Sequence, residues 1–125
     1  MKASIAAVVM AAFAATLSSQ AHAATLYTQG ASSIAAETLY CQAVNVKSAP
    51  VDVTIEVHHI DGTVLSSSNG PITIQPGHIA GRSSSQSGAD YCKFIVAGSK
   101  RAVRAAAFFS NPANNDEYTV AVPAQ

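Results

Sequence analysis

Residues 51–58 alternate apolar and polar side chains without a break, and this run constrains the fold more than any other stretch. In an extended chain one face carries Val51, Val53, Ile55 and Val57, and the other carries Asp52, Thr54, Glu56 and His58. Such a pattern of β-favouring residues is typical of a half-buried strand. Its apolar face needs a second layer to cover it, so the run predicts an antiparallel, two-layer β fold.

Shorter β-favouring runs separated by turn residues occupy much of the remaining chain. We expect further strands at 25–29, 38–43, 63–65, 72–74, 78–82, 91–96, 101–109 and 118–122. We expect turns or polar connections at 30–37, 44–50, 66–70, 83–88 and 111–117. The fold class predicted is therefore an all-β antiparallel sandwich of seven to nine short strands, or a partly closed barrel.

The Asp61-Gly62 pair predicts a hairpin after the 51–58 strand. A three-residue loop, 60–62, pairs Val57 with Leu65 on the inner face and His58 with Val64 on the outer face. A two-residue loop would instead place Leu65 on the polar face. We therefore expect the longer loop, with Gly62 left-handed in a bulge.

The first 23 residues have the three parts of a secretory signal peptide. Lys2 supplies the positive charge, residues 5–17 are apolar and rich in Ala, and Ala21-His22-Ala23 is a small-x-small cleavage site. The apolar run is shorter than the ~20 residues that a membrane-spanning helix needs. We therefore expect a single β-sandwich domain at 24–125, exported to the periplasm or secreted, with no membrane span.

The only two cysteines, Cys41 and Cys92, are expected to form one disulfide. Exported chains keep disulfides, and neither residue lies in a C-x-x-C motif. The bond would close a loop of about fifty residues, for which the chain-entropy model gives roughly 4 kcal/mol of stabilisation. That is a large share of the stability of a small domain.

Composition and charge exclude several classes of protein. With 49% hydrophobic and 11% charged residues, the chain is not disordered by composition. It carries seven Lys and Arg against seven Asp and Glu, and loss of Lys2 leaves one net negative charge. A near-neutral chain gives no electrostatic indication of nucleic acid or of an anionic membrane as a partner.

The chain resembles short exported bacterial β-sandwich proteins and, more loosely, immunoglobulin-like and fibronectin type III-like sandwiches. The resemblance rests on Tyr40-Cys41, Asn45-Val46, Pro50-Val51-x-Val53-x-Ile55, Asp61-Gly62-x-Val64-Leu65, Ile74-x-Pro76-Gly77, Tyr91-Cys92-Lys93-Phe94 and Val103-Arg104-Ala105. The chain differs from immunoglobulin domains in having no Trp and in placing Tyr91 directly before Cys92. The resemblance implies the fold and carries over no functional residues.

Histidines offer one candidate site, a metal centre that uses His58 or His59 together with His78. Imidazole suits copper, zinc and nickel. Adjacent strand residues point to opposite faces, so His58 and His59 do not readily share one ion. The alternative interpretation is that these histidines are exposed at a hairpin end and bind nothing.

We expect no enzymatic activity and no cofactor. The serines at 66–68 and 83–85 lie outside any G-x-S-x-G motif, and Asp52 and Glu56 are well separated along one strand face. The cations Lys100, Arg101 and Arg104 lie near one turn, where an acidic partner or a glycan is the alternative to plain solvation.

Outer-face apolar residues give the leading functional hypothesis, which is a binding or structural module. We expect Tyr40, Val44, Val64, Ile95 and Phe108 to lie opposite the core, where a cluster would mark an interface. An edge strand at 25–29 or 118–122 could also add to a partner's sheet. The sequence thus predicts a non-enzymatic module for an envelope or surface protein or a glycan; the alternative is a small histidine-based metal-binding periplasmic protein.

Overall fold

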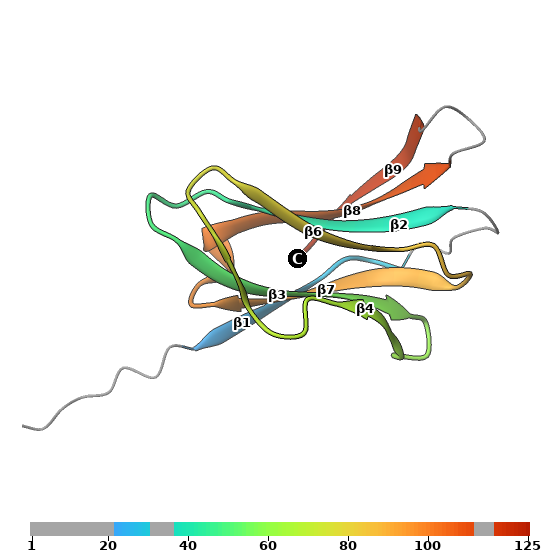
Figure 1. Cartoon of the computed structure of the whole chain (residues 1–125), viewed down its shortest axis with the longest axis horizontal. Helices are drawn as coiled ribbons and strands as arrows, with labels where there is room; N and C mark the ends of the chain where they lie inside the picture. The colour runs from blue at the N-terminus through green and yellow to red at the C-terminus, as the bar shows by residue number, and fades with distance from the viewer. Residues whose placement is uncertain (1–21, 31–36, 112–116) are drawn as a thin grey trace, which may run out of the picture.

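Two antiparallel β-sheets stacked face to face form the fold, as Figure 1 shows. The computed structural model describes residues 22–30, 37–111 and 117–125. Residues 1–21 of the predicted signal peptide lie outside the described residues, as do 31–36 and 112–116 of the predicted connections. The prediction of an all-β antiparallel sandwich with one disulfide is confirmed.

Nine strands and one short helix make up the described elements. The first sheet has the order β1-β7-β3-β4, with β5 also paired to β3: β1 (Ala23–Tyr27), β3 (Val51–His59), β4 (Val64–Ser67), β5 (Ile72–Ile74) and β7 (Ala89–Ala97). The second sheet has the order β6-β2-β8-β9: β2 (Thr38–Asn45), β6 (Ile79–Ser84), β8 (Val103–Asn111) and β9 (Glu117–Pro123). The 3₁₀ helix η1 (Lys100–Ala102) leads from β7 into β8.

The core lies between the sheets and is built by alternate residues of the long strands. The residues with no solvent exposure include Leu39 on β2, Val53, Ile55 and Val57 on β3, and Phe94 and Val96 on β7. Each buried side chain of this size contributes roughly 1.5–3 kcal/mol to folding. The alternation of residues 51–58 predicts a strand with one face covered by a second layer, and β3 has this position. It lies inside the first sheet, and the second sheet covers its apolar face.

The predicted disulfide joins the two sheets. Cys41 on β2 and Cys92 on β7 are bonded, with their Cα atoms 5.6 Å apart, and neither side chain is exposed. That separation lies within the usual range for a disulfide. Because β2 and β7 are interior strands of their sheets, the bond links the two layers at the centre of the sandwich.

The hairpin after β3 confirms part of the prediction and corrects part of it. His58 pairs with Val64, the His59 amide donates to the Thr63 carbonyl at 2.9 Å, and Gly62 has φ +89°, as the three-residue loop requires. However, the register shifts between Val57 and His58, so Val57 pairs with Ser66. The prediction that Val57 pairs with Leu65 is wrong, because Leu65 is the extra residue of a bulge.

Residue Asn45 corrects the predicted turn at 44–50, because β2 continues through it. Its side chain has no solvent exposure. The Nδ2 group donates to the carbonyls of Ala49 and Ile74, each at 2.8 Å, and Oδ1 accepts from the Lys47 amide at 2.8 Å. Asn45 therefore belongs to the strand, and its buried side chain binds the turn that follows it.

Two polar stretches predicted as connections also contain strand residues. Ser66 and Ser67 belong to β4, and Ser83 and Ser84 belong to β6. Serine has little strand preference of its own. These residues are extended because their neighbours pair: Ser66 lies opposite Val57, and Ser84 lies opposite Leu39.

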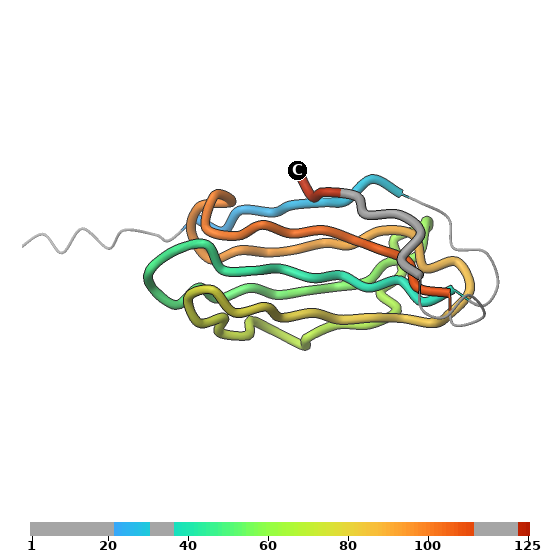
Figure 2. Tube along the Cα trace, turned by 90° about the horizontal axis from the view of Figure 1, so that it is seen from above, coloured from blue at the N-terminus to red at the C-terminus, as the bar shows by residue number. Residues whose placement is uncertain are grey.

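The residues that follow β9 link the two sheets at one edge of the sandwich. The Tyr27 amide donates to the Gln125 carbonyl and the Gln125 amide donates to the Tyr27 carbonyl, both at 3.1 Å. Figure 2 shows this end of the chain lying beside β1. The outer edge of β1 is therefore paired at Tyr27, which limits the predicted use of this strand for adding to a partner's sheet.

Candidate functional site

The outer face of the first sheet carries polar groups that bind one another, together with Tyr27 and Val64, each 48% exposed. Thr73 Oγ1 donates to Asp52 Oδ1 at 2.6 Å. Lys93 Nζ lies 3.5 Å from Glu56 Oε2. Val64 and Ile95, which we expected on an outer face, do lie here, with Val64 opposite His58 and Ile95 between Thr25 and Thr54.

The outer face of the second sheet carries what we call the apolar patch: Tyr40, Gln42, Val44, Ile79, Ala106 and Phe108. The strand registers place them in three rows, with Tyr40 beside Phe108, Gln42 beside Ala106, and Val44 beside Ile79. Ile79 is 63% exposed. Three of the five predicted outer-face residues, Tyr40, Val44 and Phe108, therefore gather on one face.

Two aromatic rings form one end of the apolar patch. Tyr40 on β2 and Phe108 on β8 are stacked, with their centroids 5.3 Å apart and their planes 10° apart. Aromatic pairs of this kind contribute about 0.5–1.5 kcal/mol beyond their buried area. The stack therefore favours one arrangement of the two rings at this end of the patch.

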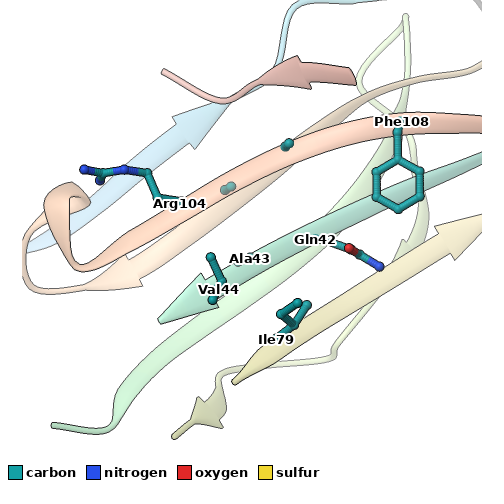
Figure 3. A pocket seen from close by; sticks show the side chains of 8 residues that line it. Gln42, Ala43, Val44, Ile79, Arg104 and Phe108 are labelled. Carbon is teal, nitrogen blue, oxygen red and sulfur yellow. The ribbon is translucent and has the colours of Figure 1, made fainter. Parts of the chain in front are cut away.

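A shallow hollow of about 240 Å³ separates the aromatic end from Val44 and Ile79. Figure 3 shows the Gln42 side chain between Phe108 and Ile79, and the Arg104 guanidinium directed away from them. In the middle row the two neighbours of Gln42, Gly81 and Ala106, are small. A Cβ on Gly81 would lie 2.9 Å from the Cys41 carbonyl oxygen and 3.1 Å from Gln42 Cγ, so only glycine fits beside Gln42.

Exposed cations gather at the end of the sandwich next to the apolar patch. Lys100 and Arg101 on η1 and Arg104 on β8 line a second hollow of about 410 Å³. Lys47 lies at the same end, because the Val46 amide donates to the Ala102 carbonyl at 3.0 Å. In the described part of the chain, none of these four side chains has a carboxylate within 4.0 Å.

His58 is buried on the outer face of the first sheet, which corrects the expectation of an exposed hairpin residue. It is 6% exposed and stacks on Tyr91, with ring centroids 4.9 Å apart. Its Nε2 lies 2.8 Å from Glu56 Oε2, and its Nδ1 lies 3.1 Å from the Gly62 carbonyl oxygen. His58 therefore joins β3 to the hairpin loop and to β7.

Both ring nitrogens of His58 lie beside hydrogen-bond acceptors. A carbonyl oxygen only accepts, so Nδ1 donates to Gly62. Burial acts to raise the pKa of Glu56, but the hydrogen bond from His58 and the charges of Lys93 and His58 bring that pKa below its usual value. An ionised carboxylate also only accepts hydrogen bonds, so His58 is placed between two acceptors, the Gly62 carbonyl and Glu56.

The structure does not bring the predicted metal-binding histidines together. His59 lies 3.1 Å from Asp61 Oδ1, beside the hairpin loop. His78 lies at the other end of β3, where its carbonyl accepts from the Asn45 amide; the length of β3 puts it roughly 20 Å from His58. Within the ranges that the structure describes, no group of three or more His, Cys, Asp or Glu side chains is placed to hold an ion.

Comparisons with protein-family models, with curated proteins and with solved structures find no match to this chain. The candidate site is therefore defined by the structure alone. Sequence reasoning missed Ile79, Gln42 and Ala106 as members of the apolar patch. The alternation of β6 was the available signal, because it places Ile79 on the same face as the other outward residues of that strand. The register that sets Ile79 beside Val44 is known only from the pairing of β6 with β2.

Proposed function

We propose that this protein is an exported, non-enzymatic module that binds a protein partner through the apolar patch. The observation that carries the proposal is the contrast between the two outer faces. On the first sheet the exposed Tyr27 and Val64 share their face with an ion pair and hydrogen-bonded polar groups, while the second sheet exposes Ile79 beside Val44 and a stacked aromatic pair. Contiguous apolar surface of this kind marks interaction sites.

The shape of the apolar patch favours a protein over a small molecule or a sugar. Its hollow of about 240 Å³ is smaller than the ~300–1,000 Å³ of typical ligand pockets. Tyr40 and Phe108 already cover one face of each other's ring. A side chain from a partner fits between this stack and Ile79, and Arg104 at the border gives such a partner a cation to match.

Export is part of the proposal, with residues 1–23 as a cleaved signal peptide and 24–125 as a single domain. The buried disulfide supports it, because such bonds persist in oxidising compartments. Among the residues that the structure describes, no helix is long and apolar enough to cross a membrane. Periplasmic and secreted locations both satisfy these observations.

An immunoglobulin-like relationship is also proposed, on architecture alone. A disulfide that joins an early strand of one sheet to a late strand of the other supports it. The strand order differs from that of immunoglobulin domains, in which the first two strands share a sheet. Here β1 lies beside β7 in the first sheet, whereas β2 lies beside β8 in the second.

A matched pair of variants tests the binding proposal. Ile79→Ser lies in the apolar patch, whereas Ile60→Ser lies in the β3–β4 turn, and both residues are highly exposed, at 63% and 72%. We expect Ile79→Ser to lose at least tenfold in affinity for the protein that co-purifies with the tagged chain from the cell envelope, and Ile60→Ser to bind as wild type does. Equal binding by both variants would contradict the proposal.

A further inference from the structure

The hollow of about 410 Å³ at the cationic end is separate from the apolar patch in its chemistry. We call it the basic hollow and define it by its lining: Leu26, Lys100, Arg101, Val103, Arg104, Ala105, Pro123, Ala124 and Gln125. It lies where β8 and the C-terminal residues meet β1. Unlike the hollow of the apolar patch, its volume lies within the range of ~300–1,000 Å³ typical of ligand sites.

Three cations converge on the basic hollow without anionic partners in the described residues. Lys100, Arg101 and Arg104 are exposed, and no carboxylate among those residues lies within 4.0 Å of them. Arg104 makes one hydrogen bond with the protein, from Nη1 to the Val103 carbonyl at 3.4 Å. A guanidinium has five N–H donors, so most of those on Arg104 remain available to a ligand.

The floor of the same hollow is apolar. Among its lining residues Leu26 and Val103 are buried, Ala105 and Ala124 are half-buried, and Pro123 is exposed. Leu26 and Val103 are held there by the sheets, since Leu26 pairs with Phe94 and Val103 pairs with Asn45. Pro123 and Ala124 keep accessible apolar surface beside the hollow, which a purely inorganic anion would leave in contact with water and a ligand with an apolar body would cover.

We propose that the basic hollow binds a small organic anion that carries a carboxylate or phosphate head group on an aliphatic chain. Arg101 and Arg104 hold the head group, because the planar guanidinium pairs with carboxylate and phosphate oxygens through two parallel hydrogen bonds. Lys100 adds a third positive charge. The aliphatic chain lies on the accessible apolar surface of Pro123 and Ala124.

Net charge gave no indication of this site. The chain as a whole is neutral, with seven cations and seven carboxylates. However, Lys100 and Arg101 lie on η1 and Arg104 begins β8, so three of the cations meet within five residues of one corner. A small local field of one sign is enough to select a small anion, even where the whole molecule attracts none.

Titration of the purified protein with octanoate, octyl phosphate, octanol and octylamine tests the proposal. We expect saturable binding of at least one of the two anions, with backbone amide shifts at residues 100–104 and 124–125. We expect at least tenfold weaker binding of octanol and octylamine. In the double variant Arg101→Gln/Arg104→Gln, the affinity for the anion should fall at least tenfold, and far-ultraviolet circular dichroism should show that the fold is kept.

Lys47→Gln is the matched control, since Lys47 is exposed at the same end but does not line the basic hollow. We expect it to bind the anion within twofold of wild type. Three results would overturn the proposal: no saturable binding of either anion, equal binding of octanol and the anions, or an equal loss in the Lys47 and double arginine variants. The last result would show diffuse charge attraction instead of a site.

Discussion

At the scale of single residues, Asn45 organises one end of the sandwich through its side chain. It ends β2, yet its three hydrogen bonds fix the loop that follows and the end of β5. A buried amide of this kind stabilises the fold only while all of its hydrogen-bond partners are present, because each buried group left unpaired costs about 1–3 kcal/mol.

Replacement of Asn45 by Ala should therefore destabilise the protein by about 3 kcal/mol, because the Ala49 and Ile74 carbonyls and the Lys47 amide lose their partner. Urea denaturation of Asn45→Ala measures this. Gln75→Ala, an exposed residue of the β5–β6 turn, should stay within about 0.5 kcal/mol of wild type. Similar stabilities for the two variants would show that the hydrogen bonds of Asn45 carry little free energy.

Glu56 makes the stability of the fold depend on pH. Its pKa in the folded protein is lowered from the ordinary value of 4.5, in spite of burial, by the hydrogen bond from His58 and by the charges of Lys93 and His58. A lowered pKa means that the stabilisation is complete above about pH 4.5 and is lost as the pH falls through the folded pKa.

Unfolding measured between pH 6 and pH 3 should therefore show a steeper loss of stability in wild type than in Glu56→Gln, which has no carboxyl to protonate. Lys93→Gln should give an intermediate slope, since it removes one of the charges that lower the pKa. If wild type and Glu56→Gln lose stability in parallel, the coupling of Glu56 to its neighbours is absent.

At the scale of elements, two loops contain glycines with almost equal φ angles and different surroundings. Gly62 in the β3–β4 turn has φ +89° and Gly88 before β7 has φ +86°. A Cβ at Gly62 meets nothing within 4 Å, whereas one at Gly88 would lie 2.5 Å from the His59 ring. A comparison of substitutions at the two glycines therefore separates the cost of backbone strain from the cost of a side-chain clash.

We expect Gly62→Ala to cost about 1 kcal/mol from the left-handed backbone alone, and Gly88→Ala to cost about 1 kcal/mol more because the His59 ring must move. Thermal or urea unfolding measures both. In a His59→Ala background the two glycine substitutions should become equal in cost. A persistent difference there would place the extra cost of Gly88→Ala outside its contact with His59.

The disulfide between β2 and β7 should contribute about 4 kcal/mol, because it closes a loop of 51 residues in the unfolded chain. Guanidinium unfolding of the wild type with and without dithiothreitol measures this contribution. The double variant Cys41→Ala/Cys92→Ala should unfold close to the reduced wild type. Two titratable thiols in the unreduced, unfolded protein would contradict the bond.

Much of the fold could be predicted from sequence because strand alternation reports which side of a strand is buried. The faces of β3 and β7 follow from it, whereas the Cys41–Cys92 bond follows from the presence of two cysteines in a chain predicted to be exported. The errors share one cause: Asn45, Ser66 and Ser84 are polar residues that are extended because of their partners. The local sequence pattern contains no information on cross-strand pairing. For the same reason, the bulge at Leu65 could not be predicted from the sequence.

The candidate site could be predicted less well, since a patch depends on register between strands. Tyr40, Val44 and Phe108 were assigned to an outer face by parity alone. That Ile79 joins them, while Val64 and Ile95 lie on the other sheet, follows from strand order. His58 was placed on the correct face, but its burial depends on Tyr91 and the hairpin loop.

At the scale of the whole molecule, the two outer faces and one end have distinct chemistry. The first sheet presents polar groups that bind each other, the second presents the apolar patch, and Lys47, Lys100, Arg101 and Arg104 give one end a positive charge. Arg104 lies on the border between the apolar patch and the basic hollow. A partner bound to the patch would therefore lie close to any anion in the hollow.

Site-specific photocrosslinking in living cells tests the central claim, that the apolar patch is where this protein meets its partner. The photoreactive residue benzoylphenylalanine replaces Ile79 in one strain and Ile60 in another, since both positions are highly exposed. We predict a protease-sensitive crosslinked species from position 79 and none from position 60. Crosslinking of equal yield and identity from both positions, or from position 60 alone, would contradict the account.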